Sequence, residues 1–322
     1  MKAAVYYETG GPEVFRYEEI PDPVAPDDGV LVKVEAISVE GGDTLHRSGG
    51  EMGAVPTVVG YQCAGTVVSV GARVSGLAPG DRVITVGLDG SHAELRAAPE
   101  AFCWKIPDGL STEEAACVPV AFGTAHDCLF EFGRLAPGET VLVQAGASGV
   151  GIAAIQLAKR AGARVLATAS SDTKLERLRE LGLDDGINYS VRKVAEEVFM
   201  LTEGRGVDVV VESVGGPGLA QSLECLAYKG RCVSLGDAGR GGPALVDVST
   251  LRPKNLTLCG YFMGAELLLG PNTYGAIASI LNDVAARSLR VVIDRTYPLE
   301  QAEEAHRFIE SRQAFGRVLL VP

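Results

Sequence analysis

The stretch from Val141 to Gly151, Val-Leu-Val-Gln-Ala-Gly-Ala-Ser-Gly-Val-Gly, constrains the fold of this chain more than any other segment. Residues 141–143 form a short apolar run that is long enough for a buried strand. Four small residues at 145–148 follow, and then Gly149 and Gly151. Apolar residues recur after them with helical spacing until Gly162, which can end a helix. The sequence therefore predicts a buried strand, a tight turn and a helix in direct succession.

The small residues of this turn would let a diphosphate approach the backbone N–H groups at the helix N-terminus. Gly146 and Gly151 match the outer positions of a G-x-G-x-x-G pattern, but the middle position is Ser148. Glycine-rich turns also join strands to helices in proteins that bind no nucleotide. The turn alone therefore leaves a dinucleotide site and an ordinary structural turn both open.

The next predicted strand, residues 164–168, indicates which dinucleotide would bind. An NAD-binding protein places a carboxylate at the end of this strand to hold the adenosine ribose. This chain has small residues at 169–171, although Asp172 is close. Lys174 follows in the first turn of the next helix, where a cation opposes the helix dipole and suits an anion. This combination predicts NADPH over NADH; the alternative is a solvated lysine on a surface helix.

Composition narrows the class of protein. A chain of 322 residues is long enough for two domains, and 47% hydrophobic with 22% charged residues is typical of globular proteins. The net charge of −12 disfavours nucleic-acid and anionic-membrane partners. No apolar run is long enough to span a membrane, and residues 1–5 start as a strand without a signal-peptide pattern. Seven cysteines without a C-x-x-C pair predict reduced thiols, so we expect a cytoplasmic protein.

The pattern of predicted secondary structure changes near residue 118. Before it, short alternating strands are separated by turns such as Pro79-Gly80-Asp81, which predicts an antiparallel, partly barrel-like β domain. After it, strands alternate with helices, which predicts a doubly wound parallel sheet. Residues after about 260 follow neither pattern exclusively and include a late amphipathic helix and a closing strand at 316–321.

Seven stretches together resemble the medium-chain dehydrogenase/reductase superfamily, in particular its zinc-free quinone oxidoreductase branch. They are residues 2–5, Asp43 with 47–49, 60–65, 79–83, 141–151, 212–215, and 311–312 before 316–318. The resemblance implies an α/β protein with a GroES-like β-rich catalytic domain (residues 1–118 and 260–322) and a Rossmann NADP-binding domain (residues 119–259). It also implies a homodimer that pairs through the nucleotide domain.

Members of this superfamily with catalytic zinc carry a cysteine three residues before the aspartate that matches Asp43, and later a Gly-His-Glu triplet. Here these positions hold Glu40 and Gly60-Tyr61-Gln62. Residues 86–102, where a structural zinc cluster is expected, contain no cysteine, and the four histidines show no ligand spacing. We therefore predict a protein without a metal site.

Without a metal, the substrate must accept hydride readily, as a quinone or an activated alkene does. The zinc-free relatives have asparagine where this chain has Glu40. Glu40 would face the nicotinamide and either tune the reaction or donate a proton to the reduced substrate. Alternatively, it is a solvated loop carboxylate or a partner for Arg47. Tyr61 would donate a hydrogen bond to substrate, or else it only packs. These two residues are the candidate catalytic groups.

The resemblance also implies contacts to each part of the cofactor. Thr124 would contact the nicotinamide side; Ala147, Ser148, Gly149 and Val150 would hold the diphosphate; Ser170, Lys174 and Tyr189 would hold the 2′-phosphate. Val214, Leu235 and Gly236 would lie under the ribose and nicotinamide, and Phe262 and Arg317 would close the cleft between the domains. Val214 and Leu235 would equally suit an apolar core, and Tyr189 a surface position.

Three functions remain open. An NADPH-dependent quinone or activated-alkene reductase is the one we favour. A 2-enoyl-thioester reductase would use the same fold and hydride, but residues 49–53 lack the active-site tyrosine that thioester-reducing relatives place nearby. A non-catalytic cofactor- or RNA-binding relative is the third, and the charge of −12 disfavours its binding to RNA.

Overall fold

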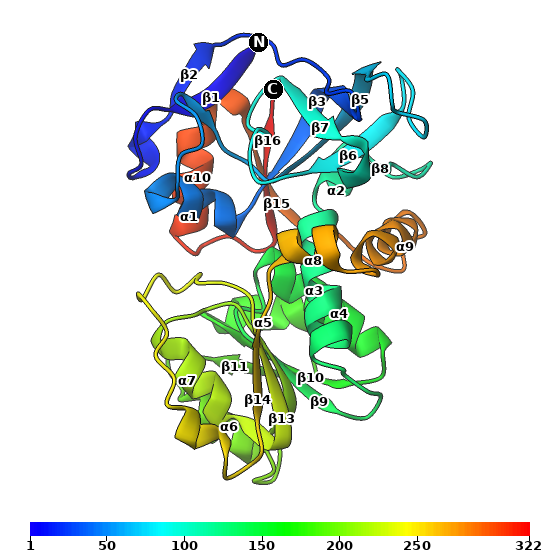
Figure 1. The fold of residues 1–322 in the computed structure, drawn as a ribbon. Coiled ribbons are helices and arrows are strands. Elements are labelled where there is room, and N and C mark those ends of the chain that lie inside the picture. Colours follow the sequence, from blue (N-terminus) through cyan, green and yellow to red (C-terminus); the bar gives the residue numbers. More distant parts are fainter. The chain divides into compact units, whose positions relative to one another are not determined.

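The computed structural model describes residues 1–322 and divides into two compact units. The catalytic unit comprises Met1–Val120 and Gly264–Pro322, and the nucleotide unit comprises Ala121–Met263. Figure 1 shows both units, each with its own sheets and helices.

The nucleotide unit is built on a six-stranded parallel sheet in the order β11-β10-β9-β12-β13-β14. Its strands are β9 (Thr140–Val143), β10 (Arg164–Ala169), β11 (Asp185–Asn188), β12 (Val207–Glu212), β13 (Leu226–Ser234) and β14 (Thr257–Gly260). The helices between them are α4 (Gly149–Arg160), α5 (Asp172–Arg179), α6 (Val194–Leu201) and α7 (Pro217–Glu224). The chain runs outward in both directions from the β9–β12 pair, so the carboxyl ends of these strands form the switch point where such sheets bind ligands.

The strands of this sheet are apolar because helices cover both faces. Every residue of β9 and β12 is buried, and Leu142, Leu166 and Val210 lie in one core cluster. Continuous apolar runs of this kind are expected for parallel strands buried on two sides.

Helical turns of unusual pitch open the nucleotide unit. The π-helical segments η3 (Pro119–Gly123) and η4 (Asp127–Phe132) flank the short helix α3 (Thr124–His126). The unit ends where β14 leads through Tyr261 and Phe262 to α8 (Met263–Leu269). Such π-helical turns are frequent at functional sites.

The catalytic unit contains two sheets. The larger has the order β15-β16-β3-β5-β6-β8, with β7 also paired to β3, and the smaller has the order β2-β1-β4. Its strands are β1 (Lys2–Tyr6), β2 (Arg16–Glu19), β3 (Gly29–Val39), β4 (Thr57–Val58), β5 (Gln62–Val70), β6 (Arg82–Val86), β7 (Leu95–Pro99), β8 (Cys103–Lys105), β15 (Ile293–Pro298) and β16 (Arg317–Val321). Its main helices are α1 (Gly41–Gly49), α2 (Thr112–Ala116), α9 (Thr273–Ala285) and α10 (Ala302–Glu310).

The last part of the chain completes this unit. Strand β16 pairs antiparallel with β3, so that Leu320 lies opposite Ile37. Both residues share a core cluster with Ala305 of α10. The fold is therefore the α/β combination that we predicted, a GroES-like β-rich domain with a Rossmann sheet.

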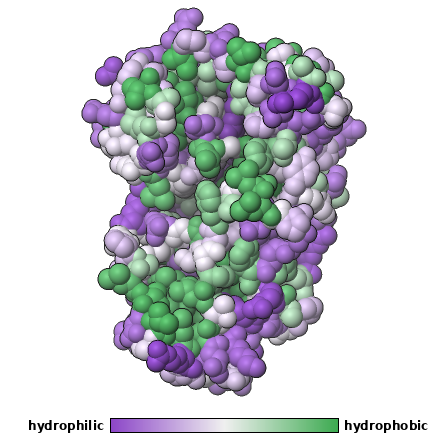
Figure 2. Space-filling view, in the orientation of Figure 1, coloured by the Kyte–Doolittle hydropathy of each residue, from purple (hydrophilic) through white to green (hydrophobic).

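No helix has the length and apolar character needed to cross a membrane. All seven cysteines are free thiols, and six of them are buried. Figure 2 shows polar residues over most of the displayed face of both units, with apolar residues gathered on the nucleotide unit near α7. Exposed apolar side chains of the nucleotide unit include Leu245 and Val248, which precede β14.

Candidate active site

The turn between β9 and α4 has the form that we predicted from residues 141–151. Ser148 is the N-cap of α4, and its hydroxyl accepts a hydrogen bond from the Gly151 N–H at 3.0 Å. The chain reaches this cap through Ala145, whose φ of 51° lies in the left-handed region. The turn therefore presents the N-terminus of a twelve-residue helix at the carboxyl end of β9.

Two glycines of this turn are required by close packing. A Cβ on Gly151 would lie 2.5 Å from the Ala145 carbonyl oxygen, and a Cβ on Gly146 would lie 2.9 Å from Ala167 Cβ. At Gly151 backbone thus lies directly against backbone, which brings N–H groups close to any bound group. The first N–H groups of a helix have no intrahelical acceptor, so the segment from Ala147 through Ser148 and Gly149 to Val150 fits an anionic diphosphate.

The carboxyl ends of β10 and β11 lie side by side. Ala169 is paired with Asn188 in the sheet, so Ser170 and Tyr189 leave neighbouring strands at the same edge. The Ser190 hydroxyl donates to the Ser170 carbonyl at 3.0 Å, and Tyr189 is 44% exposed. Lys174 lies in the first turn of α5, which begins beside Ser170.

Asp172 is the nearest carboxylate that could serve an NAD ribose, and it is engaged elsewhere. The side chain of Asn188 donates to Asp172 Oδ1 at 3.1 Å. This edge of the sheet therefore offers hydroxyl groups and a lysine, together with a carboxylate that already has a partner.

The carboxyl ends of β12 and β13 meet in the same way. The Leu235 N–H donates to the Glu212 carbonyl at 2.9 Å, which holds Leu235 and Gly236 beside the residues that follow β12. The buried Glu212 carboxylate accepts the N–H of Val214 at 2.9 Å and that of Gly215 at 3.1 Å. Sequence analysis missed this clamp, although the run Glu212-Ser213-Val214-Gly215 was among the motifs.

Two further candidates frame this end of the sheet. Thr124 is 6% exposed and begins α3, and Phe262 is 58% exposed and follows β14. Close to Thr124 and Phe262 in the chain, the Tyr261 hydroxyl donates a hydrogen bond of 3.0 Å to Asp127. No local sequence pattern indicates this pair.

Glu40 is the centre of the polar site in the catalytic unit, and it is 4% exposed. Its Oε1 accepts from Gln62 Nε2 at 2.6 Å and from the guanidinium of Arg317. Arg317 also donates to the Ser38 hydroxyl. Burial raises the pKa of Glu40, and the adjacent charge of Arg317 acts in the opposite direction.

Of the alternatives for Glu40, neither the solvated carboxylate nor the pair with Arg47 matches the structure. Arg47 is fully buried and pairs with Glu310 instead, and its guanidinium donates to the Gly10 carbonyl at 2.5 Å. Gln62, which was noted only as a missing zinc ligand, is the residue that fixes the Glu40 carboxylate together with Arg317.

Tyr61 and Asp43 adjoin this pair. Asp43 accepts the backbone N–H of Glu40 at 2.8 Å and that of Tyr61 at 3.0 Å. Burial and the charge of Glu40 raise the pKa of Asp43 to about 8. The Tyr61 ring lies over Gly42, where a Cβ would be 2.7 Å from the hydroxyl oxygen, and burial raises the pKa of Tyr61 to about 12.

No group of three or more His, Cys, Asp or Glu side chains is arranged to hold a metal ion. Two of the four histidines do meet, however, because His92 Nε2 lies 3.0 Å from His306 Nε2 in the core of the catalytic unit. Their separation of 214 positions explains why no spacing pattern revealed them.

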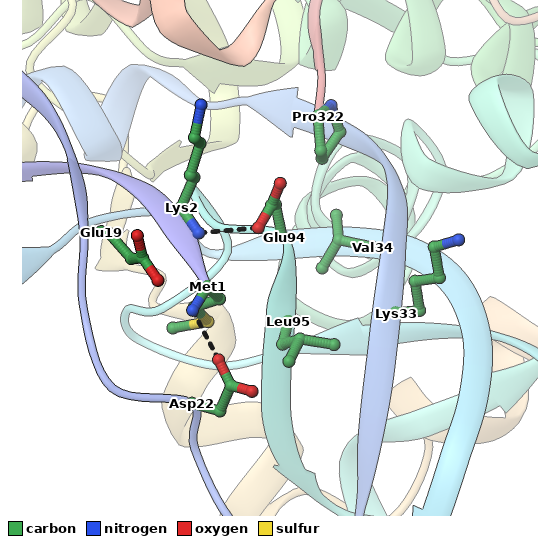
Figure 3. Close-up of a pocket in the computed structure, with 9 residues that line it drawn as sticks. All are labelled: Met1, Lys2, Glu19, Asp22, Lys33, Val34, Glu94, Leu95 and Pro322. Carbon is green, nitrogen blue, oxygen red and sulfur yellow. Dashed lines mark hydrogen bonds and ion pairs between the residues drawn. The ribbon is translucent and has the colours of Figure 1, made fainter.

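A separate pocket of about 620 Å³ lies in the catalytic unit, as Figure 3 shows. Two polar contacts lie in its lining: the Lys2 backbone N–H donates to Glu94 at 2.7 Å, and the Met1 amine lies 2.5 Å from Asp22. None of the candidate site residues lines it.

Comparison with known proteins agrees with this geometry. Residues 26–108 match the model of the alcohol dehydrogenase GroES-like domain, and residues 149–282 match that of the zinc-binding dehydrogenase. Those matches define the class as a two-domain dehydrogenase/reductase.

Individual relatives show to which branch of this class the chain belongs. The chain is 31% identical to 2-haloacrylate reductase of Burkholderia sp. over 100% of this chain and 99% of the relative. It is 30% identical to quinone oxidoreductase of Sus scrofa over 100% and 98%. The crystal structure of Escherichia coli quinone oxidoreductase complexed with NADPH has a TM-score of 0.95, 29% identity and 100% coverage of both chains. The chain belongs to the quinone oxidoreductase-type branch of the medium-chain dehydrogenase/reductase family and is an oxidoreductase.

A further relative is much longer. The chain is 36% identical over 304 residues to a phenolphthiocerol/phthiocerol polyketide synthase of Mycobacterium tuberculosis, and the match covers 91% of this chain but 13% of that protein.

Proposed function

We propose that this protein is an NADPH-dependent, zinc-independent reductase that transfers hydride to a quinone or to an activated α,β-unsaturated carbonyl compound. The observation that carries the cofactor assignment is the edge formed by β10 and β11. There Ser170, Tyr189 and Lys174 leave adjacent elements, while Asn188 occupies the nearest carboxylate, Asp172.

The residues of the nucleotide unit fit the rest of this cofactor. The α4 N-terminus from Ala147 to Val150 would hold the diphosphate, and Lys174 would bind the 2′-phosphate. Thr124, Val214 and Leu235 with Gly236 would contact the nicotinamide half at the carboxyl end of the sheet. NADPH supplies a hydride when bound, and Phe262 would cover the nicotinamide half.

The catalytic unit supports a reaction without a Lewis acid. Glu40 stands at the position of a zinc ligand in zinc-containing members of the superfamily. Its carboxylate is already paired with the Arg317 guanidinium and accepts a hydrogen bond from Gln62. Tyr61 would donate a hydrogen bond to the substrate oxygen, because a phenol hydroxyl is protonated at neutral pH. Glu40 and Arg317 would set the electrostatic potential beside Tyr61.

The decisive experiment follows NADPH consumption by EDTA-treated protein with 1,4-benzoquinone, and repeats it with NADH. Rapid turnover with NADPH that survives EDTA would support the proposal. Loss of turnover on EDTA treatment with recovery on added zinc would refute zinc independence, and equal rates with NADH would refute the cofactor assignment.

A second candidate, a 2-enoyl-thioester reductase, rests on the match to a polyketide synthase. An α,β-unsaturated thioester accepts hydride by the same chemistry. Turnover of crotonyl-CoA without turnover of quinone would favour this candidate.

We further propose that two copies pair through the nucleotide unit and that the protein works in the cytoplasm. Strand β14 is the edge of its sheet, and Leu245 (89% exposed) and Val248 (64% exposed) precede it. Leu245→Asp with Val248→Asp should convert a dimer to a monomer in sedimentation, with Leu268→Asp on α8 as control. The free cysteines suit a reducing compartment.

A further inference from the structure

Arg96 of β7 is a cation buried in the catalytic unit, with 4% of the residue exposed. Its Nη1 donates to the Tyr61 carbonyl at 3.0 Å and to the Thr85 carbonyl and hydroxyl, both at 3.2 Å. Its Nη2 donates to the Asp89 carbonyl at 2.7 Å. None of these acceptors is a carboxylate, so the charge is buried among neutral groups, which is costly. What a guanidinium adds over an apolar side chain here is a donor to three separate segments of the chain.

The fold brings these segments together around the guanidinium. Tyr61 directly precedes β5 and Gly87 directly follows β6, and the Gly87 N–H donates to the Tyr61 carbonyl at 2.8 Å. A Cβ on Gly87 would lie 2.7 Å from Arg96 Nη2, so the missing side chain leaves the room that the guanidinium occupies. Arg96 therefore anchors the end of one strand to the start of the next.

The backbone of Tyr61 is held on both sides of its Cα. Its N–H donates to Asp43 at 3.0 Å, and its carbonyl accepts from both Arg96 and Gly87. A carbonyl oxygen has two lone pairs, so the two donors use both. Peptide planes are rigid, and fixing the planes before and after a Cα fixes the direction in which the side chain leaves the chain. Arg96 thus helps to determine where the Tyr61 hydroxyl lies.

We propose that Arg96 is a positioning residue that holds Tyr61 in place as the hydrogen-bond donor to the substrate oxygen. This inference rests on the proposed function, which makes Tyr61 that donor. Arg96 acts through the Tyr61 backbone and needs no contact with the substrate. Without it, the peptide that follows Tyr61 keeps only the hydrogen bond from Gly87. A displacement of about 1 Å at a reacting group can lower the rate by about 100-fold.

A double-mutant cycle in kcat tests this role. Steady-state kinetics with NADPH and 1,4-benzoquinone are measured for the wild type, Arg96→Met, Tyr61→Phe and the double variant. We expect Arg96→Met to lower kcat by about 10- to 100-fold with little change in the KM for quinone, because the affected hydrogen bond acts in the transition state. In the Tyr61→Phe background no hydroxyl remains to be positioned, so the same substitution should change kcat by less than about 2-fold. An unchanged kcat for Arg96→Met, or an equal loss in both backgrounds, would overturn the inference.

Arg82→Met is the matched control. Arg82 lies on β6 and donates from Nη2 to the Leu110 carbonyl at 2.9 Å and to the Thr112 hydroxyl at 3.1 Å. Its loss likewise removes a guanidinium from a neutral carbonyl, and it should lower the thermal stability of the protein without lowering kcat. A loss of kcat as large as that of Arg96→Met would show that destabilisation of the unit is the cause, and would overturn the positioning role.

Arg96→Lys serves in the same cycle if Arg96→Met does not fold. Lysine keeps the charge but has a single nitrogen in place of the guanidinium fork, so it cannot hold Tyr61 and Asp89 as arginine does. We expect kcat to fall in the Tyr61 background and to change little in the Tyr61→Phe background. Wild-type kcat in Arg96→Lys would show that charge alone suffices, and would overturn the inference.

The same measurements separate this inference from the proposed function. Wild-type protein that does not turn over quinone or enone would refute the proposed function itself. An unchanged kcat for Tyr61→Phe would refute the donor role of Tyr61. A loss of kcat in Tyr61→Phe together with an insensitive, folded Arg96→Met variant would refute the positioning role of Arg96 alone.

Discussion

Glu40 and Arg317, 277 positions apart in the sequence, form a buried ion pair in the catalytic unit. Antiparallel pairing of β16 with β3 sets Val318 opposite Val39 and thereby brings the guanidinium to the carboxylate. A buried ion pair is costly to break on one side, because the remaining charge keeps its desolvation penalty.

Arg317→Met should therefore lower the free energy of unfolding of the catalytic unit by about 3–5 kcal/mol. Trp104, the only tryptophan, lies in this unit and reports its unfolding by fluorescence in denaturant. The double variant Glu40→Leu with Arg317→Met should recover much of the loss. Arg179→Met, which breaks an exposed pair with Glu176, should cost under about 1 kcal/mol. Equal stability of the single and double variants would contradict the account.

Lys174→Ala should weaken NADPH binding by about 1.5–3 kcal/mol, because a charge-assisted contact to the 2′-phosphate is lost. NADH lacks this phosphate, so its affinity should hardly change. Calorimetric titration of both cofactors measures the difference, and Lys193→Ala, which removes the partner of Glu196 on the surface, is the matched control. Equal losses for NADPH and NADH would reject the role of Lys174.

Gly151→Ala should abolish measurable NADPH binding, because the new Cβ would lie 2.5 Å from the Ala145 carbonyl oxygen and force the turn apart. Gly275→Ala on α9 adds the same methyl group where no atom lies within 4 Å, and should stabilise the protein by up to about 1 kcal/mol. Thermal unfolding and NADPH titration of both variants provide the comparison. Intact binding by Gly151→Ala would show that the turn tolerates a side chain.

The pH dependence of stability should depend on His92. Burial, and next the charge of Arg96, lower the pKa of His92 to about 3 from 6.5. Between pH 3 and pH 6.5, His92 is protonated in the unfolded chain but neutral in the native state. The free energy of unfolding therefore falls as the pH drops from 6.5 toward 3.

The slope that His92 adds approaches about 1.4 kcal/mol per pH unit. Denaturant unfolding at several pH values should show that the free energy of unfolding of His92→Gln depends less steeply on pH than that of the wild type. Phe15→Leu, which removes a ring stacked on His92, should lower stability without changing the slope. An unchanged slope in His92→Gln would show that other groups dominate.

Tyr61→Phe distinguishes a hydrogen-bond donor from a packing residue. Loss of a donor to the developing oxyanion should lower kcat by about 100-fold and leave the affinity for NADPH unchanged. Steady-state kinetics with quinone measure this effect, and Tyr297→Phe in the same unit is the control. An unchanged kcat would show that Tyr61 is a packing residue and not a hydrogen-bond donor to the substrate.

Much of the fold could be predicted because its signals are local. The apolar run at 141–143 became β9, and the small-residue turn became the α4 N-terminus. The strand predicted at 164–168 likewise became β10. Each of these depends on the side chains of one short segment, whose periodicity matches one backbone geometry.

The sequence by itself determined the order of strands and helices, the small-residue turn and the group of hydroxyls and a lysine after β10. Tertiary structure alone decided which distant polar groups meet: Glu40 with Arg317, His92 with His306, and Asp127 with Tyr261. The physical reason is that local backbone preferences depend on neighbouring residues, whereas a buried polar group is stabilised by whichever partner the packed strands bring to it. No spacing along the chain encodes such a partner.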